Sequence, residues 1–344
     1  MDLALYCPDC GYYETENDRI GRRGDFHTSV SVGPLFGELL AFQFAAWLAQ
    51  LGAGRLQLVE SGAHDGRLAA DILRWLQQWR PDIFARTEYL IGEISTRRQG
   101  WQRKTLQEFA AKVRWLDPDM APQAGRFNGI IFANEFLDAL PVHRVGWDAR
   151  QREWYEWGVV VKEEQFCWSR MKKSQILSPE SPVSERLRTL PAELLDILPD
   201  DFTTELPPVA ERWWHHAGMA LQHGWLLTID YGLLTDDFFA PHRSWGTLRA
   251  YRRHRLCKNL LANAGGQDLT AHVNFSAIQQ VGETAGLRTE LFTTQADFLV
   301  QVMKRFWSET EARGAWTNLR NRAFQTLVHP AHLGRAFRVL VQSR

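Results

Sequence analysis

The first part of the chain alternates short apolar runs with segments whose apolar residues recur three and four positions apart. The short runs predict strands at 55–60, 88–93, 113–117 and 128–136. The helical spacing predicts helices at 33–51, 66–79 and 96–111. Because strands and helices alternate, and because 128–136 is almost continuously apolar, we predict a doubly wound, mostly parallel sheet of the Rossmann-like α/β class.

The pattern changes after residue 141. Residues 142–208 carry successive strand patterns and then a polar, proline-punctuated stretch, which predicts an inserted β-rich lobe. A helix at 209–222 and a strand at 224–230 return to the first pattern. We therefore expect an N-terminal helical segment at 1–52, a core made of 53–141 and 209–300, the lobe at 142–208, and helices that close the chain at 301–344.

The composition argues against several classes of protein. The 344 residues include 40 Lys+Arg and 40 Asp+Glu, so the formal net charge is zero and we expect no nucleic-acid partner. No apolar run approaches the roughly 18 residues of a membrane span, so we expect no membrane insertion. The start, MDLALYCPDCGYY, has neither a secretory nor a transit-peptide pattern. With only four cysteines in addition, we expect a cytoplasmic protein.

Cys7 and Cys10 have the spacing of a metal knuckle. A structural zinc site needs four ligands, and the other two cysteines, Cys167 and Cys257, are isolated in the sequence. We therefore predict an ordinary turn at these positions and no metal site.

The stretch LVESGAHDGRLAADIL at 58–73 leads from a predicted strand through two glycines into a predicted helix. Glycines let a ligand approach the backbone closely, and the start of a helix offers unpaired N–H groups. We expect Glu60, Gly62 and Gly66 to contact a nucleotide-like cofactor, and Glu93, at the end of the next strand, to accept its ribose hydroxyls. A tight strand-to-helix turn without a ligand is the alternative.

A dinucleotide site normally reads G-x-G-x-x-G, and here His64 occupies the place of the second glycine. That glycine lets a pyrophosphate lie against the backbone. S-adenosylmethionine (SAM) has no pyrophosphate, so the histidine disfavours a nicotinamide cofactor more than it disfavours SAM.

Six longer stretches resemble one family. They are ALYCPDCGYY at 4–13, GDFHTSVSVGPLFGELLA at 24–41, FANEFLDALPVH at 132–143, TIDYG at 228–232, GTLRAYRRHR at 246–255 and QDLTAHVNFSAI at 267–278. Together they look like the MidA-like family of class I SAM-dependent methyltransferases. The resemblance implies a Rossmann-like methyltransferase fold, SAM as cofactor and a protein substrate. A mitochondrial member of that family methylates an arginine of a respiratory complex I subunit and is needed for complex I assembly, so the resemblance also implies protein-arginine methylation.

Two stretches depart from the family pattern. After GDFHTS the family usually continues with a Pro-Glu-Ile-Ser-like string, and this chain has Val30-Ser31-Val32-Gly33. The loop that resembles E-L-G-P-G-R-G reads ESGAHDG here. Both departures fall in segments expected to touch the cofactor. A SAM-fold binding or assembly factor without turnover is therefore the alternative to the methyltransferase, and a nicotinamide oxidoreductase is a third interpretation.

The residues expected to handle the methyl acceptor follow predicted strands. A guanidinium acceptor would have to be held by carboxylates. Glu135 and Asp138 come directly after the strand at 128–136, and a helical turn would place them on one side. Asp230, at the end of the next core strand, is a second candidate, and the resemblance places His272 near the active cleft. The alternatives are a capping role for Glu135, a surface ion pair for Asp138 and a structural role for His272.

The remaining expectations concern the cofactor. By resemblance, Gly24, Asp25 and Thr28 should fold over the amino-acid end of SAM, with Asp25 near its ammonium, and a plain N-cap turn is the alternative. The other expected cofactor contacts are Ile94, Asn134 and Asp117, the last near the adenine amino group. The sequence leaves the oligomeric state open, a homodimer included.

Overall fold

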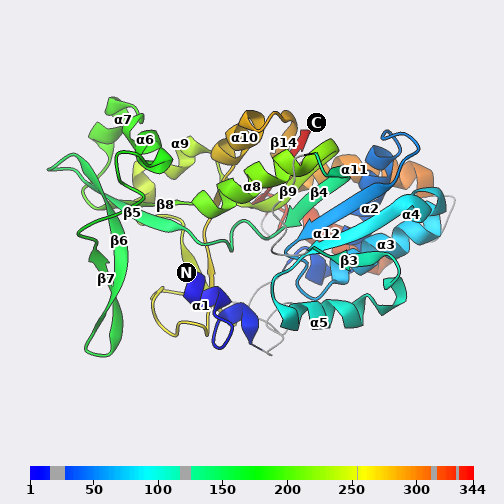
Figure 1. Cartoon of the computed structure of the whole chain (residues 1–344), viewed down its shortest axis with the longest axis horizontal. Helices are drawn as coiled ribbons and strands as arrows, with labels where there is room; N and C mark the ends of the chain where they lie inside the picture. The colour runs from blue at the N-terminus through cyan, green and yellow to red at the C-terminus, as the bar shows by residue number, and fades with distance from the viewer. Residues whose placement is uncertain (16–27, 117–124, 254, 311–315, 331–332) are drawn as a thin grey trace. The chain divides into compact units, whose positions relative to one another are not determined.

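The computed structural model describes residues 1–15, 28–116, 125–253, 255–310, 316–330 and 333–344 (Figure 1). The chain forms two compact units. The larger unit comprises Glu16–Leu137, Trp213–Gly232 and Gln279–Arg344. The smaller unit comprises Met1–Thr15, Asp138–Arg212 and Leu233–Ile278.

A central sheet is the core of the larger unit. Seven of its eight strands are β1 (Leu56–Ser61), β2 (Thr87–Gly92), β3 (Val113–Trp115), β4 (Phe127–Asn134), β9 (Leu221–Leu233), β14 (Arg288–Thr294) and β15 (Phe337–Ser343). The eighth is the two-residue strand β13 (Val273–Asn274). The first seven follow the order β14-β15-β9-β4-β1-β2-β3. The pairs from β9 through β3 are parallel, whereas β15 runs antiparallel to both of its neighbours. The predicted mostly parallel α/β sheet is confirmed.

Strands β1 and β4 are buried along nearly their whole length, with Gln57 and Asn128 the half-buried exceptions. A strand that is covered on both faces has no polar face to show in its sequence. This is why both stretches read as continuous apolar runs rather than as alternating patterns.

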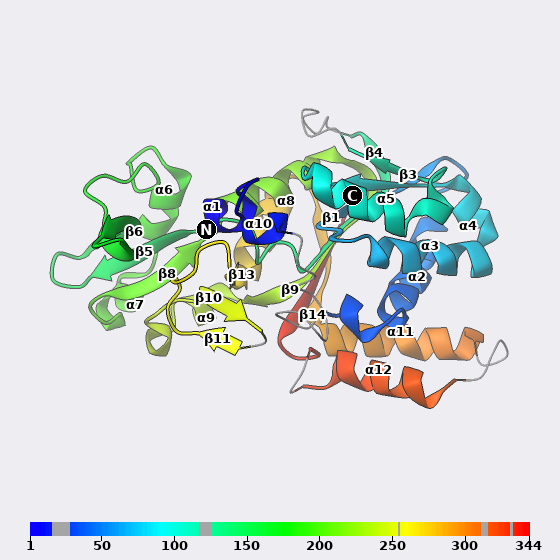
Figure 2. The ribbon, with the colours of Figure 1, turned by 90° about the horizontal axis from the view of Figure 1, so that it is seen from below.

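Helices cover this sheet. They are α2 (Leu35–Leu48), α3 (Arg67–Trp79), α4 (Pro81–Arg86), α5 (Thr96–Thr105), α11 (Gln295–Thr310) and α12 (Asn318–Val328). Helices α2, α3 and α11 share one apolar core with the sheet, in which Phe36, Leu73 and Phe132 are fully buried. Figure 2 shows α11 and α12 side by side, in agreement with their contacts.

The smaller unit contains two sheets, with strand orders β7-β6-β5-β8 and β11-β10-β12. Its strands are β5 (His143–Asp148), β6 (Glu153–Lys162), β7 (Gln165–Arg170), β8 (Phe202–Leu206), β10 (Arg249–Arg252), β11 (Arg255–Cys257), β12 (Asp268–Thr270) and β13 (Val273–Asn274). Its helices are α1 (Asp2–Tyr6), α6 (Pro182–Arg188), α7 (Ala192–Ile197) and α9 (Thr235–Phe238). Val145, Trp147 and Phe202 lie in its own apolar core. Helices α8 (Pro208–Ala220) and α10 (Phe275–Thr284) each contain a unit boundary.

Two features of the structure differ from the sequence prediction. Residues 301–344 do not consist of helices alone, because β15 forms between β9 and β14. Its sequence FRVLVQS is short and β-branched, as suits a buried strand. The predicted lobe at 142–208 also contains α6 and α7, and it shares its unit with residues 1–15 and 233–278.

Candidate active site

The predicted cofactor residues gather where parallel strands of the larger unit end. Ser61 of β1 pairs with Gly92 of β2 on one side and with Ala133 of β4 on the other. Gly62, Glu93 and Asn134 directly follow Ser61, Gly92 and Ala133 in the sequence. They therefore lie together at one edge of the sheet. The chain leaves β1 toward β2, away from β4, which makes the β1–β4 crevice a topological switch point. Ligands of open α/β sheets bind in such crevices.

Both loop glycines are required by the local backbone. Gly62 has φ of 77°, and a Cβ there would lie 2.8 Å from the Phe136 ring. Gly66, at the start of α3, has φ of 85°, and a Cβ there would lie 3.1 Å from Leu106. Residues other than glycine rarely adopt this left-handed conformation. The loop therefore keeps both glycines for a structural reason, whether or not a ligand is bound.

His64 adopts a left-handed φ of 45°, where the family loop it resembles has a glycine. Its imidazole lies near the carboxylate of Asp65, at 3.7 Å, and its ring centre is 6.1 Å from that of Trp101. The histidine ring therefore lies between Asp65 of the loop and Trp101 of α5.

Gln102 ties the loop to the ribose-binding candidate. Its side-chain amide donates to the carbonyl of His64 at 3.0 Å and to Oε2 of Glu93 at 3.3 Å. Its Oε1 accepts a hydrogen bond of 2.7 Å from the indole N–H of Trp115. Gln102 is completely buried. The sequence analysis missed this residue, because TRRQGWQRKT gives no pattern that distinguishes one buried glutamine from the exposed polar residues around it.

Glu93 is a buried carboxylate with several donors around it. Its Oε1 accepts from the backbone N–H of Ser95 at 2.9 Å, and the guanidinium of Arg98 lies 3.8 Å from Oε2. Ser95 in turn caps α5 by accepting from the N–H of Arg98. The adjacent Ile94 is 74% exposed. Glu93 is thus fixed in position, as a residue that grips a ribose has to be.

Glu60, unlike Glu93, lies within a strand rather than after its end. It lies on the same side of β1 as Leu58, is 2% exposed and accepts a hydrogen bond of 2.7 Å from the hydroxyl of Tyr89. Burial raises the pKa of Glu60 to about 7, although the bond from Tyr89 acts in the opposite direction. The carboxyl group therefore joins β1 to β2 inside the core, and its predicted contact with the cofactor stays a prediction.

Glu135 follows β4 in an unusual conformation. Its φ is 51°, a left-handed value that costs a non-glycine residue about 1–3 kcal/mol. Its Oε1 accepts from the backbone N–H of Ser29 at 2.9 Å and from the side-chain amide of Asn134 at 3.2 Å. Burial raises the pKa of Glu135 to about 8, the hydrogen bond from Ser29 lowers it, and the charge of Asp230 raises it further.

The residues after β4 do not form the helical turn that we expected for Glu135 and Asp138. Residues 135–140 are bends and a turn, and the two acids belong to different units. The backbone carbonyl of Asp138 accepts from Ala271 at 2.9 Å in the smaller unit, and its side chain is buried there. The helical-turn argument for a carboxylate pair is therefore wrong, because no helix begins at this strand end.

Asp230 holds the turn after β4. It is fully buried, and its Oδ2 accepts from the backbone N–H groups of Phe136 at 3.1 Å and Leu137 at 2.9 Å. Its Oδ1 accepts from Tyr231 at 2.8 Å. These bonds assign Asp230 a supporting role beneath the Glu135 turn.

His272 lies in the smaller unit. Its backbone N–H donates to the hydroxyl of Thr247 at 3.2 Å, and its Nδ1 is buried without a hydrogen-bond partner among the described residues. Burial, and then the charges of Arg249 and Arg243, lower the pKa of His272 to about 4. The imidazole is therefore neutral near pH 7.

Thr28 forms hydrogen bonds within a short turn, and its predicted contact with SAM stays a prediction. Its hydroxyl accepts from the N–H of Ser31 at 3.0 Å at the start of the 3₁₀ turn Val30–Val32. The next residue, Ser29, is the one that donates to Glu135. The predicted contacts of Gly24, Asp25 and Asp117 lie outside the described residues.

The edge of the sheet fits SAM in two respects. The Oδ1 atom of Asn134 is buried and has no hydrogen-bond partner among the described residues, so it can accept from the ammonium of a ligand. Glu93 offers a carboxylate next to the loop, as ribose hydroxyls require. A buried acceptor without a donor is costly, and this one belongs to the last residue of β4, beside the end of β1.

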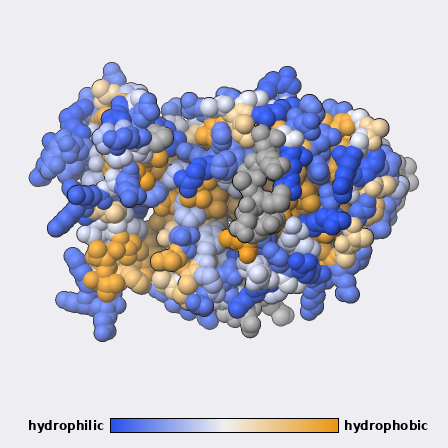
Figure 3. All heavy atoms as spheres, in the orientation of Figure 1, coloured by the Kyte–Doolittle hydropathy of each residue, from blue (hydrophilic) through white to orange (hydrophobic). Residues whose placement is uncertain are grey.

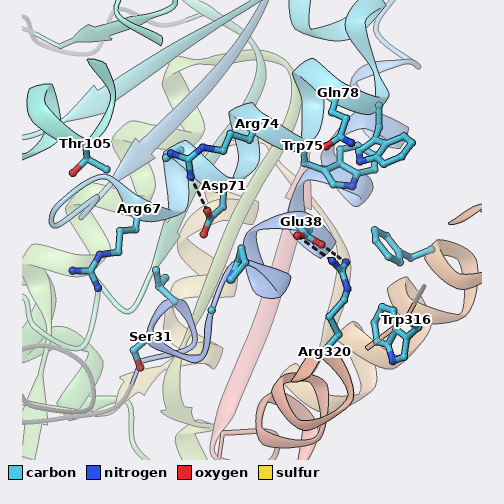
Figure 4. A pocket seen from close by; sticks show the side chains of 16 residues that line it. Ser31, Glu38, Arg67, Asp71, Arg74, Trp75, Gln78, Thr105, Trp316 and Arg320 are labelled. Atoms are coloured by element: carbon cyan, nitrogen blue, oxygen red, sulfur yellow. Dashed lines mark hydrogen bonds and ion pairs between the residues drawn. The ribbon is translucent and has the colours of Figure 1, made fainter. Parts of the chain in front are cut away.

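A separate cavity of about 760 Å³ lies among α2, α3, α11 and α12 (Figure 4). An ion pair between Glu38 of α2 and Arg320 of α12 crosses it, and Asp71 pairs with Arg74 at 3.4 Å. Burial raises the pKa of Asp71 to about 6, against the charge of Arg74. Its lining includes Val30, Ser31 and Gly33, which belong to a segment expected to touch the cofactor, but none of the individual residues named above as cofactor or acceptor contacts.

Comparison with known proteins identifies the family. Residues 39–293 match the model of a family described as "Putative S-adenosyl-L-methionine-dependent methyltransferase". The chain belongs to this methyltransferase family. A crystal structure from Burkholderia thailandensis with bound S-adenosyl-homocysteine is similar to it, with 30% identity and a TM-score of 0.83. The match covers all of this chain and 86% of that protein. The predicted fold, family and cofactor class are thereby confirmed.

Curated relatives of the methyltransferase carry more specific names. The protein arginine methyltransferase NDUFAF7 homolog of Drosophila melanogaster is 28% identical over 83% of this chain. The mouse and human proteins named protein arginine methyltransferase NDUFAF7 are 28% and 27% identical, over 98% and 82% of this chain. The chain spans 66%, 78% and 64% of the lengths of these three relatives.

The cytoplasmic location expected from the sequence is contradicted by these relatives, all three of which are named as mitochondrial proteins. Within the described ranges, no helix has both the length and the apolar character needed to cross a membrane. The part of the chain that the structure describes also contains no group of three or more His, Cys, Asp or Glu side chains arranged to hold a metal ion.

Proposed function

We propose that this member of the methyltransferase family transfers a methyl group from SAM to an arginine of a protein substrate. Relatives named as protein arginine methyltransferases support the choice of acceptor. The observation that carries the proposal is Glu135, a half-buried acid in a left-handed conformation at the switch point. Beside it, Oδ1 of Asn134 is buried and has no hydrogen-bond partner among the described residues.

The cofactor, when bound, supplies a methyl group on a positively charged sulfur. The chain's residues then have to position the groups and remove a proton. Glu93 binds the ribose hydroxyls, and Oδ1 of Asn134 accepts from the ammonium. The close-packed loop at Gly62 and Gly66 brings the ligand near the start of α3.

Glu135 pairs with the guanidinium of the acceptor. A carboxyl group with a pKa of about 8 is largely protonated near pH 7, and a cation beside it favours the charged form. As the new nitrogen–carbon bond forms and the carbon–sulfur bond breaks, the acceptor nitrogen must lose a proton. The carboxylate of Glu135 is the base that we assign to take it.

The experiment is a transfer assay with the purified chain. Labelled SAM is incubated with the chain and a lysate of the source cells, and labelled proteins are digested and analysed by mass spectrometry. We expect methylation of an arginine side chain. Label on lysine, on a small molecule or on nothing at all would contradict the assignment of the acceptor.

The second candidate function is a binding or assembly factor that holds SAM without turnover. His64 favours it, because this residue takes a left-handed φ of 45° where the family loop it resembles has a glycine. Calorimetry separates the two functions. SAM binding together with transfer supports the enzyme, and SAM binding without transfer in any lysate supports the factor.

A further inference from the structure

The CPDC stretch at residues 7–10 forms a tight turn directly after α1. Helix α1 ends at Tyr6, because Cys7 precedes a proline and adopts the extended conformation that such a residue prefers, with φ of −56° and ψ of 125°. The backbone N–H of Gly11 donates to the carbonyl of Cys7 at 2.7 Å. This bond closes a turn of helical size, in which residues three positions apart are neighbours. Cys7 and Cys10 therefore lie next to each other.

The sulfur of Cys7 accepts several hydrogen bonds. The backbone N–H groups of Asp9 and Cys10 donate to it, as a backbone does to a capping side chain, and the thiol of Cys10 donates as well. These bonds favour the thiolate. The bond from the Asp9 backbone, followed by the bond from the Cys10 thiol, lowers the pKa of Cys7. The thiolate is the form that attacks a disulfide, so Cys7 is the nucleophile of the pair.

The smaller unit holds this turn from both sides. Before the turn, the hydroxyl of Tyr6 donates to the carbonyl of Ala139 at 2.9 Å. After it, the carbonyl of Cys10 lies against Gly265, where any Cβ would clash with it. Ala139 and Gly265 belong to the same unit as the turn. A bond between the two sulfurs would therefore order little backbone that is not already ordered.

The pair is open to solvent. Cys10 is exposed and Cys7 is half-buried. Figure 1 shows α1, in dark blue, on the near side of the smaller unit, and Figure 3 shows many hydrophilic residues on this side of the molecule. A small water-soluble molecule can therefore approach the two sulfurs.

We propose that Cys7 and Cys10 form a site of thiol–disulfide exchange with small disulfides of the glutathione type. The Cys7 thiolate attacks one sulfur of the small disulfide, whose S–S bond breaks and releases one thiolate. Cys10 passes its proton to solvent and attacks the Cys7 sulfur of the mixed disulfide, which releases a second thiolate. The two cysteines have then been oxidised to one internal disulfide, and the small disulfide has been reduced to two thiols.

The size of the turn suits the product. A disulfide spans only about 4.4–6.8 Å between its two Cα atoms, and the first and fourth residues of such a turn come this close. The other cysteines, Cys167 of β7 and Cys257 of β11, lie on strands of different sheets. They provide single cysteines in the same chain for comparison.

The test incubates the full, folded chain with oxidised glutathione. The remaining thiols are blocked with iodoacetamide, the chain is digested with trypsin without reduction, and the mass of the peptide of residues 1–19 is measured. We expect this peptide to carry neither label and to be lighter by two hydrogen atoms than its reduced form. Cys167 and Cys257 should each carry iodoacetamide or a single glutathione.

Two variants test which sulfur attacks. In Cys10→Ser, glutathione should remain on Cys7 as a stable mixed disulfide. In Cys7→Ser, Cys10 should take up glutathione several-fold more slowly, because it lacks the backbone donors that favour the Cys7 thiolate. In urea, where the fold no longer supplies these donors, the two variants should react at the same rate.

Two results would overturn the proposal. The first is a wild-type peptide in which Cys7 and Cys10 are labelled separately, with no internal bond, at every ratio of oxidised to reduced glutathione. The second is an equal rate of glutathione uptake by the two variants when both are folded, as checked by circular dichroism.

Discussion

The backbone N–H of Ser29 donates a 2.9 Å hydrogen bond to the side chain of Glu135, across 106 positions of the sequence. The bond ties the segment that begins at Thr28 to the end of β4. Burial holds the pKa of Glu135 at about 8 in spite of this donor. The acid therefore takes up or releases a proton in the pH range in which enzymes commonly operate.

Replacing Glu135 by glutamine tests its role as a base. Glu135→Gln keeps the size of the side chain and an acceptor for Ser29, so it should bind S-adenosyl-homocysteine as the wild type does. The transfer rate should fall about 10²–10⁴-fold, the usual contribution of a general base. Single-turnover transfer and calorimetry measure the two quantities. Asp71→Asn, in the separate cavity, is the matched control, and turnover of Glu135→Gln at the wild-type rate would refute the role.

The raised pKa values of Glu60 and Glu135 predict how stability depends on pH. In the unfolded chain each acid titrates near 4.5, whereas in the folded chain the pKa values are about 7 and about 8. Between these values the folded state holds protons that the unfolded state has released, so the free energy of unfolding falls as pH rises from about 4.5 to about 8. A pKa that is higher by one in the folded chain than in the unfolded chain corresponds to about 1.4 kcal/mol.

Urea unfolding at a series of pH values checks this dependence. Glu135→Gln cannot titrate at that position and should show a smaller fall than the wild type over the same range. Glu180→Gln, at an exposed turn, is the control and should leave the fall unchanged. A profile for Glu135→Gln that coincides with the wild-type profile would contradict the assigned titration.

Gln102 should matter for the cofactor although it lies beneath the loop. Gln102→Leu removes the hydrogen bonds to the His64 carbonyl and to Glu93, and it takes away the acceptor of the Trp115 indole N–H, a loss of about 1–3 kcal/mol in unfolding free energy. The affinity for S-adenosyl-homocysteine should fall as well, because the loop and Glu93, the acid proposed to bind the ribose, lose their common support. Trp115→Phe removes the indole N–H that donates to Gln102 and is the control. Equal affinity in wild type and Gln102→Leu would rule out the positioning role.

The loop glycine Gly62 allows steric contact and backbone strain to be separated. Gly62→Ala combines a left-handed φ of 77° with a Cβ 2.8 Å from Phe136, and it should weaken both folding and cofactor binding. Gly52→Ala has a comparable φ of 57° but no atom within 4 Å of its Cβ. Thermal unfolding should therefore show a larger loss for Gly62→Ala. Equal losses would mean that the contact with Phe136 does not matter.

Much of the fold of the larger unit could be predicted from the sequence, because β1 and β4 are short apolar runs between clear helical patterns. The strand at Phe337–Ser343 was harder to predict, since it enters the sheet far from its sequence neighbours and no local pattern gives that pairing. The smaller unit is assembled from three separated stretches, so its extent depends on contacts between distant residues.

The candidate site was predicted unevenly for a similar reason. Gly62, Glu93 and Asn134 lie at the ends of neighbouring parallel strands, so the order of the sheet brings them together. Gln102 was missed because its burial arises from the packing of α5 on the loop. The proximity argument for Asp138 failed because it assumed a helix, and the backbone after β4 makes a left-handed turn at Glu135 instead.

The central claim is that SAM binds where β1, β2 and β4 end, with Glu93 on its ribose. Calorimetric titration of Glu93→Gln with S-adenosyl-homocysteine tests it most directly, because glutamine preserves the shape of the side chain and removes the charge. Each hydrogen bond to a charged group is worth roughly 1.5–3 kcal/mol, so the affinity should fall at least about tenfold. The control is Glu88→Gln on the same strand, where the acid pairs with Arg55 and Arg114. A tenfold or greater loss confined to Glu93→Gln is the result that we predict, and wild-type affinity in that variant would contradict the site.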